Sequence, residues 1–457
     1  MIFANSLPDA KAFFATLTLP ASTTLTLVRF LVASFNGLRS AAEAADAIRL
    51  DPRHRAQLVR FLARRGWSDN WNTLAALADL LLRQCAQEDG TWVFLLDQTY
   101  HTTYGRHAQN TFSRGNKRAR PRQSQRRQKK APRHACHCFV FGLLISPRTG
   151  TRLPVVRSYY TRDYCRQRAA TATKRRPAPA FRTQADLAAE LIRGLRVPAG
   201  NPVLVLGDTA FEAQQIRAAC RQRGFDWITP ANPERVLAGR QSRPRLRAHR
   251  TQLCLESATP IALSPGLTDW WRHQRGSPSK AWHGKYARRY WAQAETLNVH
   301  NLGTVGVVFS TTQAPQAGRP APVHKILLTN RDDWDAARVV AAYAVRWQIE
   351  QFFKELKSDL GLSRYRVRDF REVEGWVQVC CSAFVYLEWY RLRRRATAAR
   401  PEAWWRLRTR GLIYQVRRES EWSEVEQIAA AMDSEQGRAR LRDSLRRAVP
   451  LEQRRPA

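Results

Sequence analysis

The residues with the clearest chemical potential lie between 343 and 357. Tyr343, Arg346, Glu350 and Lys357 follow one another at steps of three, four and seven residues. No residue in the stretch breaks a helix, and these steps place all four on one helix face. A carboxylate between two cations, with a hydroxyl nearby, suits a site that handles a metal ion together with phosphate. The alternative is an exposed helix with ordinary charge pairs.

Two further acids come directly after apolar runs. Asp97 follows the run 92–96, and Asp208 follows the run 203–206 and a glycine. Both runs have the length and composition of buried strands, and open α/β sheets carry their functional sites at the carboxyl ends of such strands. We therefore expect Asp97 and Asp208 to lie at strand tips, close to Glu350.

These three motifs resemble the DDE transposases of bacterial insertion sequences. Tyr343-x2-Arg346-x3-Glu350-x6-Lys357 matches the Tyr-Arg-Glu-Lys signature of one branch at all three spacings. Upstream of it, Asp97-Gln-Thr and Gly207-Asp208-Thr-Ala-Phe occur in the order of that family's aspartate motifs. The resemblance covers roughly residues 90 to 395.

The resemblance implies a ribonuclease-H-like fold and a DNA transposase that cuts element ends and joins them to target DNA. Asp97, Asp208 and Glu350 would be the catalytic acids and would hold two divalent metal ions. Hard oxygen ligands favour Mg²⁺, with Mn²⁺ as a substitute. Arg346 and Lys357 would hold the flanking phosphates, and Tyr343 would add a hydroxyl contact to the DNA.

The charge balance independently predicts a nucleic-acid partner. Seventy-six Lys and Arg residues against 38 Asp and Glu give a net charge of +38 over 457 residues. A chain this basic is expected to bind a polyanion. No apolar run approaches the roughly 20 residues of a spanning helix, and no signal-peptide pattern opens the chain. We expect a cytoplasmic, nucleoid-associated protein without membrane contact, which acts as a homodimer because two DNA ends must be joined together.

The densest positive charge lies between 106 and 133. No Asp or Glu occurs from 98 to 162, so this segment is suited to bind DNA phosphates without reading sequence. A solvated loop without a specific role is the alternative. The predicted DNA-binding residues of the segment are Arg126, Arg127, Lys129 and Lys130.

The elements that must position these residues predict an α/β chain. Apolar runs and helical periodicities give three strands, a helix, a strand, a helix and a strand, which is the ribonuclease-H-like order. The predicted domains are a helical DNA-binding domain at 1–90, a ribonuclease-H-like catalytic core at 91–232 and 325–395, an inserted mostly-β subdomain at 233–324, and a basic helical C-terminal region at 396–457. Within the first domain, two helices at 40–50 and 51–66 fit either a helix-turn-helix or a plain helical bundle.

Other interpretations remain open at this point. The cluster of His134, Cys136 and Cys138 invites a zinc site, but on a strand its side chains would alternate between faces, which favours reduced thiols. The chain could also be a catalytically inactive, transposase-derived DNA-binding protein, or a ribonuclease-H-like nuclease specific for a DNA structure. Metal-dependent nicking and strand transfer separate these classes.

Overall fold

The computed structural model divides the chain into two compact units. It describes residues 7–15, 17, 19–37, 60–63, 71–103, 107–115, 133–173, 177–239, 244–263, 288–365, 367–399 and 407–439. One unit comprises 82–102 and 110–353, and the other comprises 1–81, 103–109 and 354–457. No helix among the described residues is long and apolar enough to cross a bilayer. The architecture is mixed α/β, as the sequence predicts.

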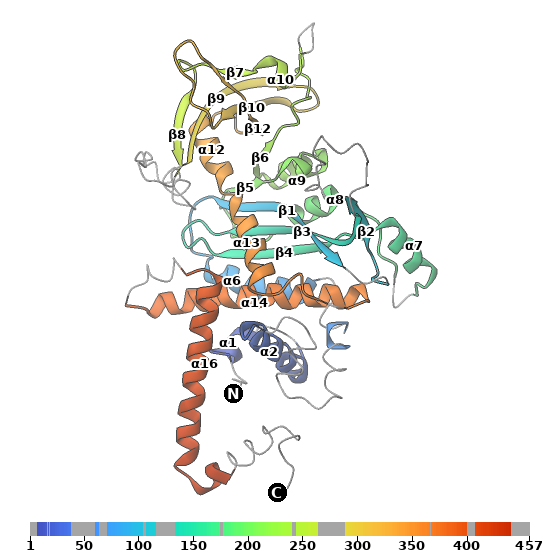
Figure 1. Ribbon diagram of the computed structural model, residues 1–457, viewed down its shortest axis with the longest axis vertical. Helices are drawn as coiled ribbons and strands as arrows, with labels where there is room; N and C mark the ends of the chain where they lie inside the picture. The colour runs from blue at the N-terminus through green and yellow to red at the C-terminus, as the bar shows by residue number, and fades with distance from the viewer. Residues whose placement is uncertain are drawn as a thin grey trace, which may run out of the picture. The chain divides into compact units, whose positions relative to one another are not determined.

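A large mixed sheet forms the centre of the first unit (Figure 1). Its strands lie side by side in the order β2-β3-β1-β5-β6-β12-β10-β9-β8, with β4 paired to β3 on a separate branch. Strands β1 and β5 are parallel, as are β5 and β6, whereas the pairs β2–β3, β3–β4, β6–β12, β10–β12, β9–β10 and β8–β9 are antiparallel. The strand bounds are β1 Trp92–Thr103, β2 Phe112–Gly115, β3 Arg133–Ile145, β4 Arg152–Ser158, β5 Val203–Leu206, β6 Asp226–Pro230, β8 Thr259–Leu263, β9 Arg288–Val299, β10 Gly303–Thr311 and β12 Lys325–Thr329.

The central strands are buried because their residues are apolar on both faces. Residues 92–96 of β1 and all four residues of β5 are buried, as expected for parallel strands covered on both sides. Packing is tight here, since a Cβ built on Gly142 of β3 would lie 2.2 Å from the Phe94 ring. Gly142 is therefore required for this close approach of the two strands.

Local sequence signals fix the helices beside this sheet. Helix α7 (Arg162–Ala170) precedes α8 (Gln184–Arg193), which begins after Thr183 in a capping box with Asp186. Helix α9 (Gln214–Arg223) ends at Gly224, whose φ of 65° is the left-handed conformation that glycine adopts readily. Helices α8 and α9 pack against each other, and α8 also contacts β3 and β4 (Figure 1).

Among the described residues of 233–324, the regular elements are strands apart from one short helix, α10 (Leu246–His249). Strands β8, β9 and β10 continue the large sheet through β12, which pairs with both β10 and β6. Strands β7 (Gln252–Leu253) and β11 (Ala321–Pro322) form a separate pair. Sheet pairing thus crosses position 324, where the sequence places a domain boundary, and the four predicted domains stay a prediction.

The predicted helix through 343–357 is interrupted. Helix α12 (Ala336–Ala344) begins after its N-cap Asp335, and α13 runs Trp347–Ser358. Between them, the N–H groups of Val345, Arg346, Gln348 and Ile349 donate to carbonyls three residues back. Such tightened turns within a helical stretch are typical of functional positions. The expectation of one continuous helix is therefore wrong.

The second unit is helical in its described part. Its elements include α1 (Ala10–Phe14), α2 (Ala21–Phe35), most of α6 (Asn72–Gln84), α14 (Phe370–Thr397) and α16 (Thr409–Met432). Helix α2 lies beside α14 (Figure 1). Aromatic rings fill the core, with Phe13 against Tyr386 and Trp389. A Cβ on Gly375 would lie 2.1 Å from the Leu62 carbonyl oxygen, so only glycine fits there.

The N-terminal predictions are met only in part by described residues. Helices α2 and α6 (Asn72–Gln84) lie within the range 1–90, which the sequence predicts to be helical. Apart from 60–63, the two helices predicted at 40–66 lie outside the described residues. The helix-turn-helix and the plain bundle therefore both stay predictions.

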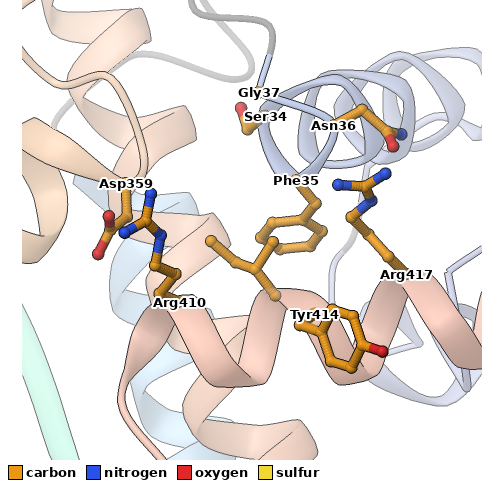
Figure 2. A pocket seen from close by; sticks show the side chains of 9 residues that line it. Ser34, Phe35, Asn36, Gly37, Asp359, Arg410, Tyr414 and Arg417 are labelled. Atoms are coloured by element: carbon orange, nitrogen blue, oxygen red, sulfur yellow. The ribbon is translucent and has the colours of Figure 1, made fainter.

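A hollow of about 300 Å³ in the second unit lies between the end of α2 and one face of α16 (Figure 2). Arg410, Tyr414 and Arg417 line it at helical spacing, and Figure 2 shows the Arg417 guanidinium beside Asn36, the C-cap of α2. Helix α2 has no basic residue in its last turn. Cations at a helix C-terminus stabilise it by about 0.3–1 kcal/mol, so α16 supplies the charge that α2 lacks.

Candidate functional site

Asp97 lies inside β1, which continues to Thr103 beyond the predicted end. The expectation that Asp97 ends its strand is therefore wrong. The parallel pairing of β1 with β5 joins Trp92 to Val203 and Leu95 to Leu206. Continuing this register by two residues brings Asp97 level with Asp208. The sheet thus aligns the two acids although they lie far apart in the sequence.

Asp208 stands two residues beyond the end of β5, at the carboxyl edge of the parallel strands. It caps the short 3-10 helix at 209–211, and its side chain accepts a hydrogen bond of 2.9 Å from the Ala210 N–H. The preceding Gly207 is needed because a Cβ there would lie 2.9 Å from the Cβ of Phe211. The chain therefore turns sharply at the strand tip and holds the Asp208 carboxylate there.

Arg346 connects the second part of the predicted site to the first. Its Nη1 lies 3.5 Å from Oδ2 of Asp97, and its Nη2 donates a short hydrogen bond to Oε1 of Glu350. The side chains are 18% exposed for Arg346, 15% for Asp97 and 35% for Glu350. This bridge depends on the tight turn at 345–346, which lies between α12 and α13. A largely buried guanidinium therefore stands between two acids that the sequence singles out.

The electrostatics show that these groups influence one another. Burial is the main reason that the pKa of the Asp97 carboxyl is raised to about 6. The charges of Asp208 and Glu350 add to this rise, whereas the Gln98 N–H and the charge of Arg346 oppose it. Burial also raises the pKa of Tyr343 to about 12, against the effect of Arg346. Burial by itself lowers the pKa of Arg346, but Tyr343, Glu350 and Asp97 outweigh it and raise the value. The five side chains therefore form one coupled group.

Lys325 is a neighbour of this group that sequence reasoning did not select. It opens β12, and its Nζ lies 5.0 Å from the centre of the Tyr343 ring. Desolvation of the ammonium and the charge of Arg346 lower the pKa of Lys325, whereas Glu350 raises it. The sequence predicts the strand 325–329 but offers no spacing that links it to Glu350. Only the pairing of β12 within the sheet reveals that Lys325 lies near this group.

Lys357 and the basic segment complete the set of predicted residues. Lys357 lies in the last turn of α13, seven residues beyond Glu350. The four predicted DNA-binding residues of the basic segment lie outside the described residues, and they are Arg126, Arg127, Lys129 and Lys130. Their roles stay predictions.

The donor set has the chemistry of a site for hard cations. Asp97, Asp208 and Glu350 present carboxylate oxygens, the donors that Mg²⁺ and Mn²⁺ prefer. Burial is the main cause of the raised pKa of Asp97, the charges of Asp208 and Glu350 add to it, and a cation among the acids would offset both effects. Within the described residues, no group of three or more His, Cys, Asp or Glu side chains is arranged to hold a metal ion. The Arg346 guanidinium is the cation that contacts two of the acids in this arrangement.

Fold and site together define an α/β protein with acids aligned at the carboxyl edge of parallel strands and a guanidinium that bridges two of them. Residues 172–386, a little under half of the chain, match the family model described as Transposase DDE domain. The match confirms the resemblance to DDE transposases. It includes Asp208, Arg346 and Glu350, whereas Asp97 precedes it. A search among curated proteins found no match.

Proposed function

We propose that this protein is a DDE transposase that cuts DNA at the ends of an insertion sequence and joins those ends to target DNA. The observation that carries the proposal is the Arg346 guanidinium, which contacts both Asp97 and Glu350 inside or beside a transposase DDE domain. The spacing of Tyr343, Arg346, Glu350 and Lys357 supports the Tyr-Arg-Glu-Lys branch of the family. The strand order β4-β3-β1-β5-β6 supports a ribonuclease-H-like core.

In this proposal Asp97, Asp208 and Glu350 hold two divalent ions, Mg²⁺ with Mn²⁺ as a substitute. Such a pair, when bound, activates the attacking oxygen and stabilises the leaving oxygen of a phosphodiester. The acids do not act as nucleophiles, because water serves for the first cut and a DNA 3′-hydroxyl serves for joining. Their task is to present oxygen ligands at a fixed separation at the sheet edge.

Arg346, Lys357 and Tyr343 bind the DNA backbone in this proposal. Arg346 has a planar fork that holds a phosphate at two oxygens, and Lys357 contributes a point charge. Asp97 and Glu350, which Arg346 contacts, would be among the residues that hold the cations. The Arg346 guanidinium would then stand between the acidic site and the phosphate that it binds, and its task would be to position the scissile phosphate.

The partners follow from the same chemistry. The substrates are the terminal inverted repeats of the element and a target duplex, and the net charge of +38 favours both. Joining two ends in a coordinated way requires two active sites, so we propose a homodimer on DNA. The protein works in the cytoplasm on nucleoid DNA.

The test uses the purified full-length protein with labelled duplexes that carry the DNA flanking its gene. With Mg²⁺, the wild type should nick these ends and join them to a plasmid. Asp97→Asn, Asp208→Asn and Glu350→Gln should each lower cleavage by at least roughly 10²-fold and leave DNA binding largely intact. Asp163→Asn is the matched control, because this exposed acid pairs only with Arg166 at the surface of α7 in the described chain.

Two outcomes would refute the proposal. Nicking without any joining under conditions that saturate the protein would indicate a nuclease with this fold. Tight binding to the element ends without metal-dependent nicking would indicate a DNA-binding protein that has lost catalysis.

A further inference from the structure

A second polar cavity lies in the same unit as the acidic site but at the opposite edge of the parallel strands. Its volume is about 570 Å³, and its walls are α9, the start of β6, the turn between β9 and β10, and Asn330 after β12. Asp226 opens β6 beside this cavity, whereas Asp208 follows the far end of the parallel β5. The acidic site lies at the carboxyl ends of these strands and the cavity at their amino ends, so the two are distinct.

Two arginines of α9 supply the charge of this cavity. Arg217 and Arg221 are four residues apart and therefore share one helix face, and both line the cavity. Arg217 is half-buried, and Arg221 is exposed. Among the described residues, the buried Nη1 atom of Arg217 has no hydrogen-bond partner, so no contact within the described chain compensates its charge. An anion bound in the cavity would supply that compensation.

The acids near the two arginines are engaged elsewhere. Glu212 bonds to Arg235 and accepts a hydrogen bond of 2.8 Å from the Asn232 N–H. Asp226 accepts from the Asn330 side chain at 3.0 Å and pairs with Arg331 at 3.2 Å. In the described part of the chain, neither Arg217 nor Arg221 forms an ion pair.

The balance of charge around Arg217 is therefore positive. Burial lowers the pKa of Arg217, the neighbouring charges of Arg235 and Arg221 lower it further, and Glu212 opposes them. An anion in the cavity would reverse these effects, because it would compensate both the burial and the repulsion between like charges.

We propose that this cavity binds a phosphate group, which Arg217 and Arg221 hold at the edge of the sheet opposite the acidic site. Two guanidiniums one helical turn apart match the oxygens of one phosphate. Asn301 in the β9–β10 turn and Thr304 at the start of β10 bring an amide and a hydroxyl to the other wall. The volume admits a phosphate with the sugar that carries it.

The source of the phosphate is the backbone of duplex DNA. This part of the proposal rests on the proposed function, in which the protein handles element ends and target DNA. A contact at the opposite sheet edge would hold a stretch of DNA that is not being cut. The phosphate site itself requires no catalysis, so it can be tested in EDTA.

The test compares the full-length wild type with Arg221→Gln, with the double variant Arg217→Gln/Arg221→Gln, and with the control Arg166→Gln. Arg166 is an exposed arginine of α7 that pairs with Asp163, so the control removes one charge outside the cavity. Fluorescence anisotropy measures binding to a random duplex of about 30 base pairs over a range of salt concentrations. Hydrogen exchange measures protection of 214–227 and 301–305 upon addition of that duplex or of millimolar inorganic phosphate. Circular dichroism verifies that each variant is folded.

We expect the double variant to bind the duplex at least roughly tenfold more weakly, the factor for about 1.4 kcal/mol. The slope of log affinity against log salt concentration should become shallower by about 0.9, because the protein no longer neutralises one DNA phosphate. Arg221→Gln alone should give part of this effect, and Arg166→Gln should leave affinity and slope near wild type. The duplex should protect both segments in the wild type and neither segment in the double variant.

Equal affinity and slope for the double variant and Arg166→Gln would overturn the proposal, as would absence of protection by both ligands. Protection by inorganic phosphate without protection by the duplex would retain the phosphate site and overturn DNA as its source. None of these results depends on cleavage, so loss of the proposed transposase activity would be seen separately.

Discussion

Asp97→Asn should stabilise the folded protein at neutral pH when divalent metal is absent. Asp97 is 15% exposed, and burial is the largest reason that its pKa rises from 3.8 to about 6. At about 1.4 kcal/mol for each pKa unit, this rise means that the ionised carboxylate lowers the free energy of unfolding by about 3 kcal/mol. Asparagine has nearly the same shape without the charge, and Arg346 retains its bond to Glu350.

The pH dependence gives this prediction its sign. Below about pH 3.8 the carboxyl is protonated in both folded and unfolded chains, so Asp97 costs nothing. Between about pH 4 and 6 the folded chain binds the proton more tightly, and stability falls as pH rises. Above about pH 6 the full cost is present. The advantage of Asp97→Asn should therefore be largest above about pH 6 and should vanish toward about pH 4.

The assay is thermal unfolding in EDTA at several pH values, with Asp163→Asn as the exposed control. A stabilisation of about 3 kcal/mol should raise Tm by several degrees at about pH 7.5, since each kcal/mol contributes roughly 2–4 °C in domains of about 150–250 residues. Added Mg²⁺ should reduce the difference in Tm between Asp97→Asn and the wild type, because it should stabilise the wild type alone. An Asp97→Asn variant that is less stable at neutral pH, or a gap that does not shrink in acid, would mean that Arg346 compensates the carboxylate fully and would refute the reasoning.

Two other predictions concern the cations. Arg346→Lys keeps the charge but loses the fork that reaches both Asp97 and Glu350, so single-turnover cleavage under saturating protein should fall by up to roughly 10²-fold, whereas Lys357→Arg should stay active; equal rates for the two variants would contradict separate roles. In the segment 106–133, alanine at the four predicted phosphate-binding positions should weaken binding to element ends and random DNA alike and flatten the salt slope by about 0.9 for each phosphate that is no longer neutralised. A selective loss of binding to element ends would instead make the segment a reader of sequence. Those four positions are Arg126, Arg127, Lys129 and Lys130.

The sequence alone determined the elements and the types of group at the site. Apolar runs predicted the strands at 92–97 and 203–206 because buried parallel strands require apolar residues on both faces. Thr183 and Gly224 lie where α8 begins and α9 ends, and such boundaries are local because capping and left-handed glycine depend on neighbouring residues. The sequence spacing of Tyr343, Arg346 and Glu350 predicted that these side chains would lie close together, and in the structure they interact with one another.

Tertiary structure decided how those groups meet. Asp97 lies 249 residues from Arg346, and their contact depends on sheet register and on the turn at 345–346. Neither is a property of a local window, because register follows from pairing with distant strands. The same holds for Lys325, which approaches Tyr343 only because β12 joins β6 and β10 in one sheet. Local sequence propensity therefore determined the helices and strands of this protein, and long-range strand pairing determined the distances between the residues of its proposed site.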